Sequence, residues 1–293
     1  MKIRLEKSGI HLFDRHNGLH ILMDEYIIPK ESISISPRTV SLALTNKCNL
    51  SCPYCYAPKN NHELSSGFVK DIAVTLDKLG TLELTFGGGE PLIYPGLTDL
   101  IQWIWNNTTL GINITSNGHL LTNSLANQLA GNLSSFRFSV DGIEPKYSKI
   151  KKRRLSFLIE KIKLLQGLIP YGMNIIVNPG SVQDTEDTIK FCIDYGSNDI
   201  LLIPEHQQGK YFLTESDWML MRDIMNKYQK EIQINLTYNA SNYVNIDYLD
   251  TDKNDEFMFA HISADQKLKR ASYSLDGIYI QDPENIAYYF SIM

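Results

Sequence analysis

The sequence of 293 residues lacks the features that mark membrane, secreted and nucleic-acid-binding proteins. No apolar run reaches the ~18 residues that a membrane-spanning helix needs. The first residues, MKIRLEKSGIHLFDRH, have no apolar core of a signal peptide, so we expect a cytoplasmic protein with no membrane partner. The formal net charge of −5 argues against nucleic acid as a partner.

Cysteine is scarce, with four in the chain, yet three of them fall in the stretch 48-CNLSCPYCY-56. In the cytoplasm, clustered cysteines bind metals or react more often than they pair. Structural zinc sites usually close all four positions, and His62 could complete a Cys3His site with Cys48, Cys52 and Cys55. A [4Fe–4S] cluster held by three cysteines instead leaves one iron open, which is what a catalytic metal needs. Cys192, in a helical pattern, is expected to be a core thiol.

Strand-like and helical patterns alternate along most of the chain. Strands are expected at 39–45, 82–86, 111–115, 136–140, 173–177, 199–203 and 232–236. Helical patterns lie near 65–79, 96–106, 120–130, 155–168, 183–194 and 215–229. This alternation indicates a parallel sheet of right-handed βαβ units. An eight-unit barrel usually takes ~250 residues. We therefore predict an α/β fold with a partial (β/α)6 barrel.

Both ends of the chain differ from this pattern. Asn17-Gly18 between two alternating stretches predicts a β-hairpin, so 1–38 reads as an N-terminal hairpin extension before a barrel at 39–240. The remaining residues, 241–293, read as a C-terminal cap. Within the cap, the acidic run 247–256 suits a hinge and 261–280 suits a hairpin.

Polar and glycine-rich segments follow the predicted strands, and these segments are 46–55, 87–92, 115–118, 139–142 and 178–180. Functional residues of such folds gather at the carboxyl ends of the strands, which meet at one rim. We therefore expect the clustered cysteines and these segments to form one site.

Two motifs together resemble the radical S-adenosylmethionine (radical SAM) enzymes. The first is C-x3-C-x2-C with Tyr54 before its last cysteine, and the second is Gly88-Gly89-Glu90-Pro91, one βα unit later. The resemblance covers roughly 39–240. It implies one [4Fe–4S] cluster on the three cysteines, with S-adenosyl-L-methionine (SAM) on the open iron. One electron then cleaves SAM to a 5′-deoxyadenosyl radical, which takes a hydrogen atom from the substrate. It also implies an external electron donor of the flavodoxin or ferredoxin type.

The same resemblance implies which residues bind SAM. Gly88, Gly89 and Glu90 are expected at the methionine amine, because glycine permits close approach and a carboxylate pairs with an ammonium. The other expected cofactor-binding residues are Tyr54 beside the cluster, Ser116, Asn117, Ser139 and Asp141 at the ribose hydroxyls or the methionine carboxylate, and Asn178 at the nucleoside. The sequence assigns no catalytic residue of the protein itself.

The segment 261–277 resembles the hairpin that opens the SPASM or twitch extension of peptide-modifying radical SAM enzymes. The cysteine expected there is missing, since Arg270, Ala271 and Ser272 occupy its position. One cysteine outside the triad cannot hold an auxiliary cluster. We expect a ribosomally synthesised peptide as substrate, with crosslinking, epimerisation or another C–H modification all open. A small molecule or nucleotide is the alternative substrate, and a non-catalytic metal-binding module is the alternative of another class.

The run 146-KYSKIKKRRLSFLIEKIK-163 is strongly basic. We expect it to form a solvated helix face. The alternatives are a patch for an anionic substrate, or Arg153 or Arg154 reaching the SAM carboxylate.

Overall fold

The computed structural model describes residues 1–207, 210–244 and 258–293. Its main feature is a ten-stranded sheet in the order β12-β9-β8-β7-β6-β5-β4-β13-β14-β15. The parallel strands that correspond to the predicted ones are β4 (Thr39–Thr45), β5 (Glu83–Gly88), β6 (Gly111–Ser116), β7 (Ser135–Ser139), β8 (Tyr171–Val177), β9 (Asp199–Pro204) and β12 (Gln233–Leu236). The predicted α/β fold with an open partial barrel is confirmed.

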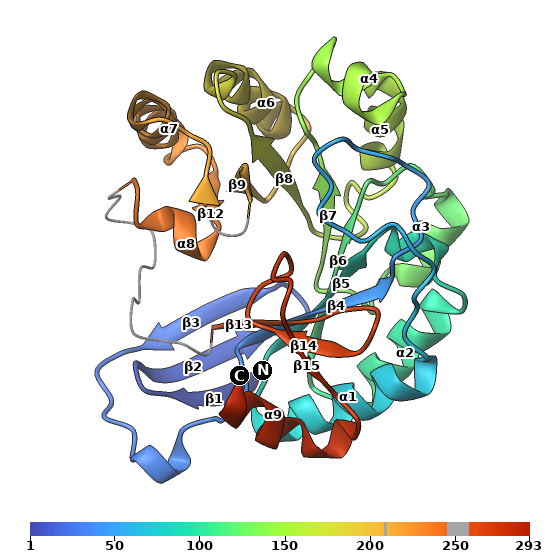
Figure 1. The fold of residues 1–293 in the computed structure, drawn as a ribbon, viewed down its shortest axis with the longest axis vertical. Coiled ribbons are helices and arrows are strands. Elements are labelled where there is room, and N and C mark those ends of the chain that lie inside the picture. Colours follow the sequence, from blue (N-terminus) through green and yellow to red (C-terminus); the bar gives the residue numbers. More distant parts are fainter. Residues whose placement is uncertain (208–209, 245–257) are drawn as a thin grey trace.

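Helices follow most of these strands and lie along the outside of the curved sheet (Figure 1). They are α1 (Ser66–Leu79), α2 (Leu97–Asn107), α3 (Asn123–Leu129), α4 (Lys146–Lys151), α5 (Leu155–Lys163), α6 (Val182–Asp194) and α7 (Glu215–Tyr228). Shorter elements are η1 (Lys30–Ser32), η2 (Pro91–Ile93), β10 (His206–Gln207), β11 (Lys210–Tyr211) and α8 (Tyr238–Ser241).

The core lies between the sheet and these helices. Alternate residues of β4, such as Leu42 and Leu44, are fully buried in it, as are Ile72 and Leu76 of α1. Burial of each such side chain stabilises the fold by roughly 1.5–3 kcal/mol. The Ser65 side chain caps α1 by accepting a hydrogen bond from the backbone of Phe68.

The opposite face of the strands is polar. Arg137 of β7 donates to Asn174 of β8 at 2.7 Å and pairs with Asp199 of β9 at 2.8 Å. Asn113 of β6 donates to Glu83 of β5 at 2.8 Å. The strands therefore alternate between an apolar face toward the helices and a polar face toward the interior of the partial barrel.

The N-terminal residues form a separate antiparallel sheet of β1 (Lys2–Glu6), β2 (Gly9–Asp14) and β3 (Leu19–Met23). The predicted hairpin around Asn17-Gly18 is therefore present, with β1 as an additional strand. Lys2 pairs with Asp77 at the end of α1, and His20 lies 3.2 Å from Glu83 at the start of β5. This sheet thus packs at the amino ends of the parallel strands, opposite the predicted rim.

The C-terminal segment joins the main sheet. Strand β13 (Phe259–Ile262) pairs parallel with β4, and its Ala260 and Ile262 are fully buried. Strands β14 (Lys267–Lys269) and β15 (Ile278–Tyr279) follow antiparallel, and then η3 (Pro283–Asn285) and α9 (Ile286–Ile292). The expected hairpin at 261–280 is present as β13, β14 and β15, and the acidic run 247–256 lies outside the described residues. Within the described ranges, no helix has the length and apolarity to cross a membrane.

The basic run 146–163 was predicted to form one solvated helix face, and the structure differs from this prediction. It forms two helices, α4 and α5, separated at Lys152, whose φ of 55° ends α4 in the left-handed region. Lys152, Arg153 and Arg154 are exposed, but the Lys151 side chain is only 4% exposed. Lys151 follows the fully buried Tyr147 by four residues, so both lie on the inward face of α4.

Candidate active site

The cysteines lie on a loop after β4 whose two ends are held together. The backbone N–H of Asn46 donates to the carbonyl of His62 at 2.9 Å, and that of Leu64 donates to the carbonyl of Leu44 at 2.9 Å. The Asn46 side chain donates to that of Asn60 at 2.8 Å. Closing the base in this way lowers the entropic cost of holding the loop in one conformation.

Cys48 and Cys55 are exposed, Cys52 is half-buried, and all three are free thiols. The Cys48 sulfur accepts a hydrogen bond from the backbone N–H of Leu50 at 3.4 Å. A single zinc ion would draw its sulfur ligands to within about 3.8 Å of each other. In the part of the chain that the structure describes, no three His, Cys, Asp or Glu side chains converge closely enough to hold one metal ion. In a [4Fe–4S] cluster each thiolate binds a separate iron, so such a cluster does not need the three sulfurs to converge on one ion.

The glycine-rich turn after β5 packs against the start of the cysteine loop. The backbone N–H of Gly89 donates to the carbonyl of Thr45 at 2.7 Å, and that of Glu90 donates to the carbonyl of Lys47 at 2.9 Å. A Cβ at Gly88 or Gly89 would lie 2.4 or 2.1 Å from backbone oxygens of this segment. These two glycines thus permit close packing of two chain segments, whereas a Cβ at Gly87 would meet open space.

Glu90 is fully buried, and its carboxylate joins the turn to the end of β6. Oε1 accepts hydrogen bonds from the Ser116 hydroxyl at 2.6 Å and the backbone of Leu92 at 3.1 Å. Oε2 accepts one from the backbone of Asn117 at 2.9 Å. Burial raises the pKa of Glu90, and these donors oppose that rise. A carboxylate has about four acceptor sites, so one remains on Oε2 for the predicted ammonium partner.

Asn117 continues this network into the cysteine loop, since its side chain donates to that of Asn49 at 2.9 Å. The structure therefore brings Ser116, Asn117 and Glu90 together, as the common rim predicts. It places the first two in a buried hydrogen-bond network rather than in open solvent.

Asp141, after β7, forms a buried ion pair with Lys151, and each side chain is 4% exposed. The Lys151 ammonium also lies 3.9 Å from the Cys52 sulfur. Although burial opposes the charged form, Asp141 and Cys52 hold the pKa of Lys151 above its usual value. Burial, with the Asp141 carboxylate beside it, raises the pKa of the Tyr54 hydroxyl. The Tyr54 hydroxyl, Asp141 and Lys151 thus form one polar cluster beside Cys52.

The two remaining predicted residues lie at the neighbouring strand ends. Ser139 ends β7 and is half-buried. The Asn178 side chain donates to Glu205 after β9 at 2.8 Å, so it links the ends of β8 and β9. Cys192 is fully buried in the core of α6, as expected, and burial raises its pKa.

The loop between β14 and β15 reaches the same end of the barrel. The Tyr273 ring packs edge-on against His206, with centroids 4.0 Å apart. Ser272 contacts the hydroxyl of Tyr56, the residue directly after the last clustered cysteine. The cap loop therefore spans from the cysteine loop to the segment after β9.

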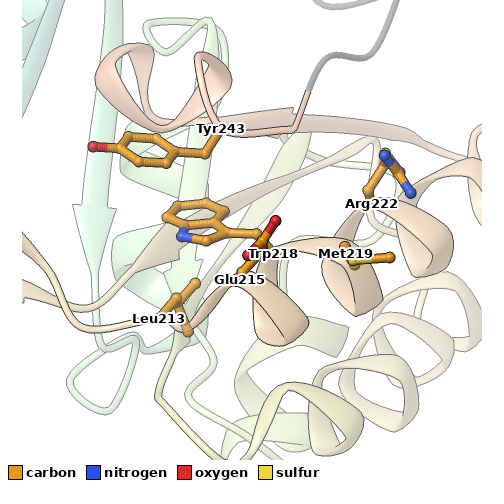
Figure 2. A pocket seen from close by; sticks show the side chains of 6 residues that line it. All are labelled: Leu213, Glu215, Trp218, Met219, Arg222 and Tyr243. Carbon is orange, nitrogen blue, oxygen red and sulfur yellow. The ribbon is translucent and has the colours of Figure 1, made fainter.

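A separate pocket of about 520 Å³ lies beside α7, away from the cysteine loop (Figures 1 and 2). The Tyr243 ring stacks on the Trp218 indole with centroids 4.7 Å apart and 14° between planes. The other lining residues are Leu213, Glu215, Met219 and Arg222. None of the predicted site residues lines this pocket.

The sequence pattern did not predict Lys151, His206 or Tyr273 as residues of this site. The signal for Lys151 was its spacing of four residues from Tyr147, which puts a lysine on a buried helix face. The contact between His206 and Tyr273 joins positions far apart in the chain, and no local pattern encodes it.

Comparisons with known proteins bear on the family and the fold of this chain. The profile of the Radical SAM superfamily matches residues 42–192. The "Probable GTP 3′,8-cyclase" of Methanocaldococcus jannaschii is 27% identical over 227 residues, which cover 73% of this chain and 75% of that protein. The "Sporulation killing factor maturation protein SkfB" of Bacillus subtilis is 27% identical over 172 residues, or 56% of this chain and 42% of that one. SuiB of Streptococcus suis, solved bound to precursor peptide SuiA, has a similar fold, with a TM-score of 0.76, 14% identity, and coverage of 98% and 87%.

Proposed function

The chain belongs to the radical SAM superfamily of enzymes, which use a [4Fe–4S] cluster and SAM, and we propose that this member modifies a ribosomally synthesised peptide. The bound cofactors supply the hard step, a radical that can remove a hydrogen atom from a C–H bond of the substrate. The remaining tasks, which are to hold the cofactors, orient the substrate and exclude water, fall to residues of this chain.

We assign the cluster to Cys48, Cys52 and Cys55. Their thiols share one loop, lie at the carboxyl end of β4 and are not fully buried, so they are available as ligands. The only other cysteine of the chain, Cys192, is fully buried, so this chain cannot hold a second cysteine-ligated cluster. Electrons must then come from outside, and we propose a flavodoxin or ferredoxin as donor. Such a donor and an oxygen-sensitive cluster both suit the reducing cytoplasm.

We assign SAM to the rim beside this loop. Glu90 is held by three donors, which fixes the turn that carries Gly88 and Gly89. The methionine amine is proposed to bind at this turn. Ser116, Asn117, Ser139, Asp141 and Asn178 are proposed to surround the rest of SAM, with Tyr54 beside the cluster. Fixed dipoles of this kind orient a ligand without having to reorganise during the reaction.

The main observation in favour of a peptide substrate is a group of aromatic side chains where the cap loop, between β14 and β15, meets the carboxyl ends of the strands. Tyr56, His206 and Tyr273 combine an apolar ring with a polar edge, which is the surface that binds peptides at low entropic cost. Ser272 and Tyr273 of the cap loop contact Tyr56 and His206, so this loop is placed to help enclose a substrate there. The likeness in fold to SuiB, solved with a precursor peptide, and the relationship to the maturation protein SkfB support the same substrate class.

A nucleotide substrate is the second candidate, because several of the curated relatives carry the name GTP 3′,8-cyclase or probable GTP 3′,8-cyclase. A direct comparison separates the two. The anaerobically reconstituted enzyme with reductant and SAM is offered, in parallel, GTP and the synthetic peptides encoded by short reading frames beside the gene. We expect a mass change in one peptide together with 5′-deoxyadenosine. Conversion of GTP with every peptide unchanged would overturn the proposal.

A further inference from the structure

We propose that Lys151 is a tuning residue for the cluster, and that its ammonium contact with Cys52 raises the reduction potential of the cluster. The ammonium nitrogen lies 3.9 Å from the Cys52 sulfur. The Lys151 side chain is 4% exposed, so water screens this contact little. The inference rests on Cys48, Cys52 and Cys55 as the cluster ligands.

Local structure fixes Lys151 in this position. It is the last residue of α4, and the left-handed conformation of Lys152 turns the chain away directly after it. Tyr147, one turn earlier, is fully buried and hydrogen-bonds to His119 at 2.8 Å. The inward face of α4 is therefore anchored, and a lysine is placed where solvation is lost.

Asp141 explains how a buried lysine stays charged. An isolated buried ammonium would lose its proton or move to solvent, whereas a paired one is retained. The carboxylate forms the ion pair with Lys151, and both side chains are almost fully enclosed. The ammonium nitrogen of the pair lies 3.9 Å from the Cys52 sulfur, so the positive member of the pair contacts the sulfur.

The consequence for the cluster follows from charge. One-electron reduction, with the electron from an external donor, adds one negative charge to a cluster that already carries thiolates. A nearby ammonium stabilises the reduced form more than the oxidised form, and hydrogen bonds to the sulfurs act in the same direction. Lys151 thus makes the cluster easier to reduce.

The test is a redox titration of the reconstituted proteins, followed by the EPR signal of the reduced cluster. For Lys151→Met we expect the ratio of reduced to oxidised cluster at a fixed potential to fall about tenfold or more, which is about 59 mV for one electron. Lys151→Arg keeps the positive charge, so its reduction potential should lie close to that of the parent. Lys152→Met removes an exposed charge from the next position and should match the parent.

Two results would overturn the inference. One is a Lys151→Met protein with an intact cluster and the parent's potential. The other is an unchanged potential with weakened SAM binding, which would make Lys151 a SAM ligand instead. If the single variant does not fold, Lys151→Met with Asp141→Asn removes both charges and should still lower the potential. Failure of the parent to assemble a cluster would instead contradict the proposed function.

Discussion

Glu90 and Ser116, which follow the neighbouring strands β5 and β6, are joined by a hydrogen bond of 2.6 Å from the serine hydroxyl to the buried carboxylate. This contact ties the glycine-rich turn to the rest of the proposed SAM site. Ser116→Ala should therefore destabilise the protein by about 1–3 kcal/mol, the cost of a buried acceptor that loses a donor. Urea unfolding of the cluster-free protein measures this cost. Ser124→Ala, at an exposed position of α3, should change stability little, and equal effects of the two variants would contradict the structural role.

Glu90→Gln should leave the cluster intact but weaken SAM binding. The substitution keeps the size of the side chain and one carbonyl acceptor but removes the charge that is proposed to face the methionine amine. A charge-assisted contact contributes about 1.5–3 kcal/mol, or roughly ten- to a hundredfold in the dissociation constant. Equilibrium binding of SAM to the reconstituted protein measures it. Parent-like affinity would place the amine elsewhere.

Tyr273→Ala should uncouple SAM cleavage from substrate modification. The substitution removes the ring contact with His206 but leaves the cysteine loop and the glycine-rich turn unchanged. We expect continued formation of 5′-deoxyadenosine with a loss of at least about tenfold in modified peptide, because an open site admits water and misplaces the substrate. Tyr288→Ala on α9 is the control, since this tyrosine is 61% exposed. If Tyr273→Ala still forms modified peptide and 5′-deoxyadenosine in the parent's ratio, the cap loop is not part of the substrate site.

Acid should destabilise the cluster-free protein in part through His119. Burial, together with Lys151 and Arg153, lowers the pKa of His119 to about 4. The unfolded chain, with an ordinary histidine pKa of about 6.5, binds this proton more readily. Stability is therefore complete above pH 6.5 and falls as the pH approaches 4, by at most about 3 kcal/mol from this residue. His119→Gln should flatten the slope over that range, whereas His16→Gln, at an exposed position, should not.

The sequence predicted the barrel because its signals are local. Strand and helix periods alternate, and the polar residues after each strand are brought to one rim by the parallel topology alone. The same topology brings the start of the cysteine loop beside the turn that carries Glu90. Loop spacing and strand order are sufficient for this part of the site.

The remaining features depend on contacts between distant segments. Strand β13 pairs with β4, the strand that leads into the cysteine loop. Removal of 241–293 would therefore take the buried Ala260 and Ile262 out of the core and leave β4 without its neighbour on that side. Because of this pairing, we expect deletion of the predicted cap to affect the strand that leads into the cysteine loop. Lys151 likewise lies in a basic run that resembles a solvated face, and only its tertiary contact with Asp141 makes its burial favourable.

The assignment of the cluster to Cys48, Cys52 and Cys55 is tested by iron and sulfide analysis of the anaerobically reconstituted protein and its four single cysteine-to-alanine variants. We expect about four irons and four sulfides per chain in the parent and in Cys192→Ala. We expect loss of the cluster in Cys48→Ala, Cys52→Ala and Cys55→Ala. Stoichiometric zinc without sulfide, or a cluster that persists in any of these three single variants, would contradict this assignment.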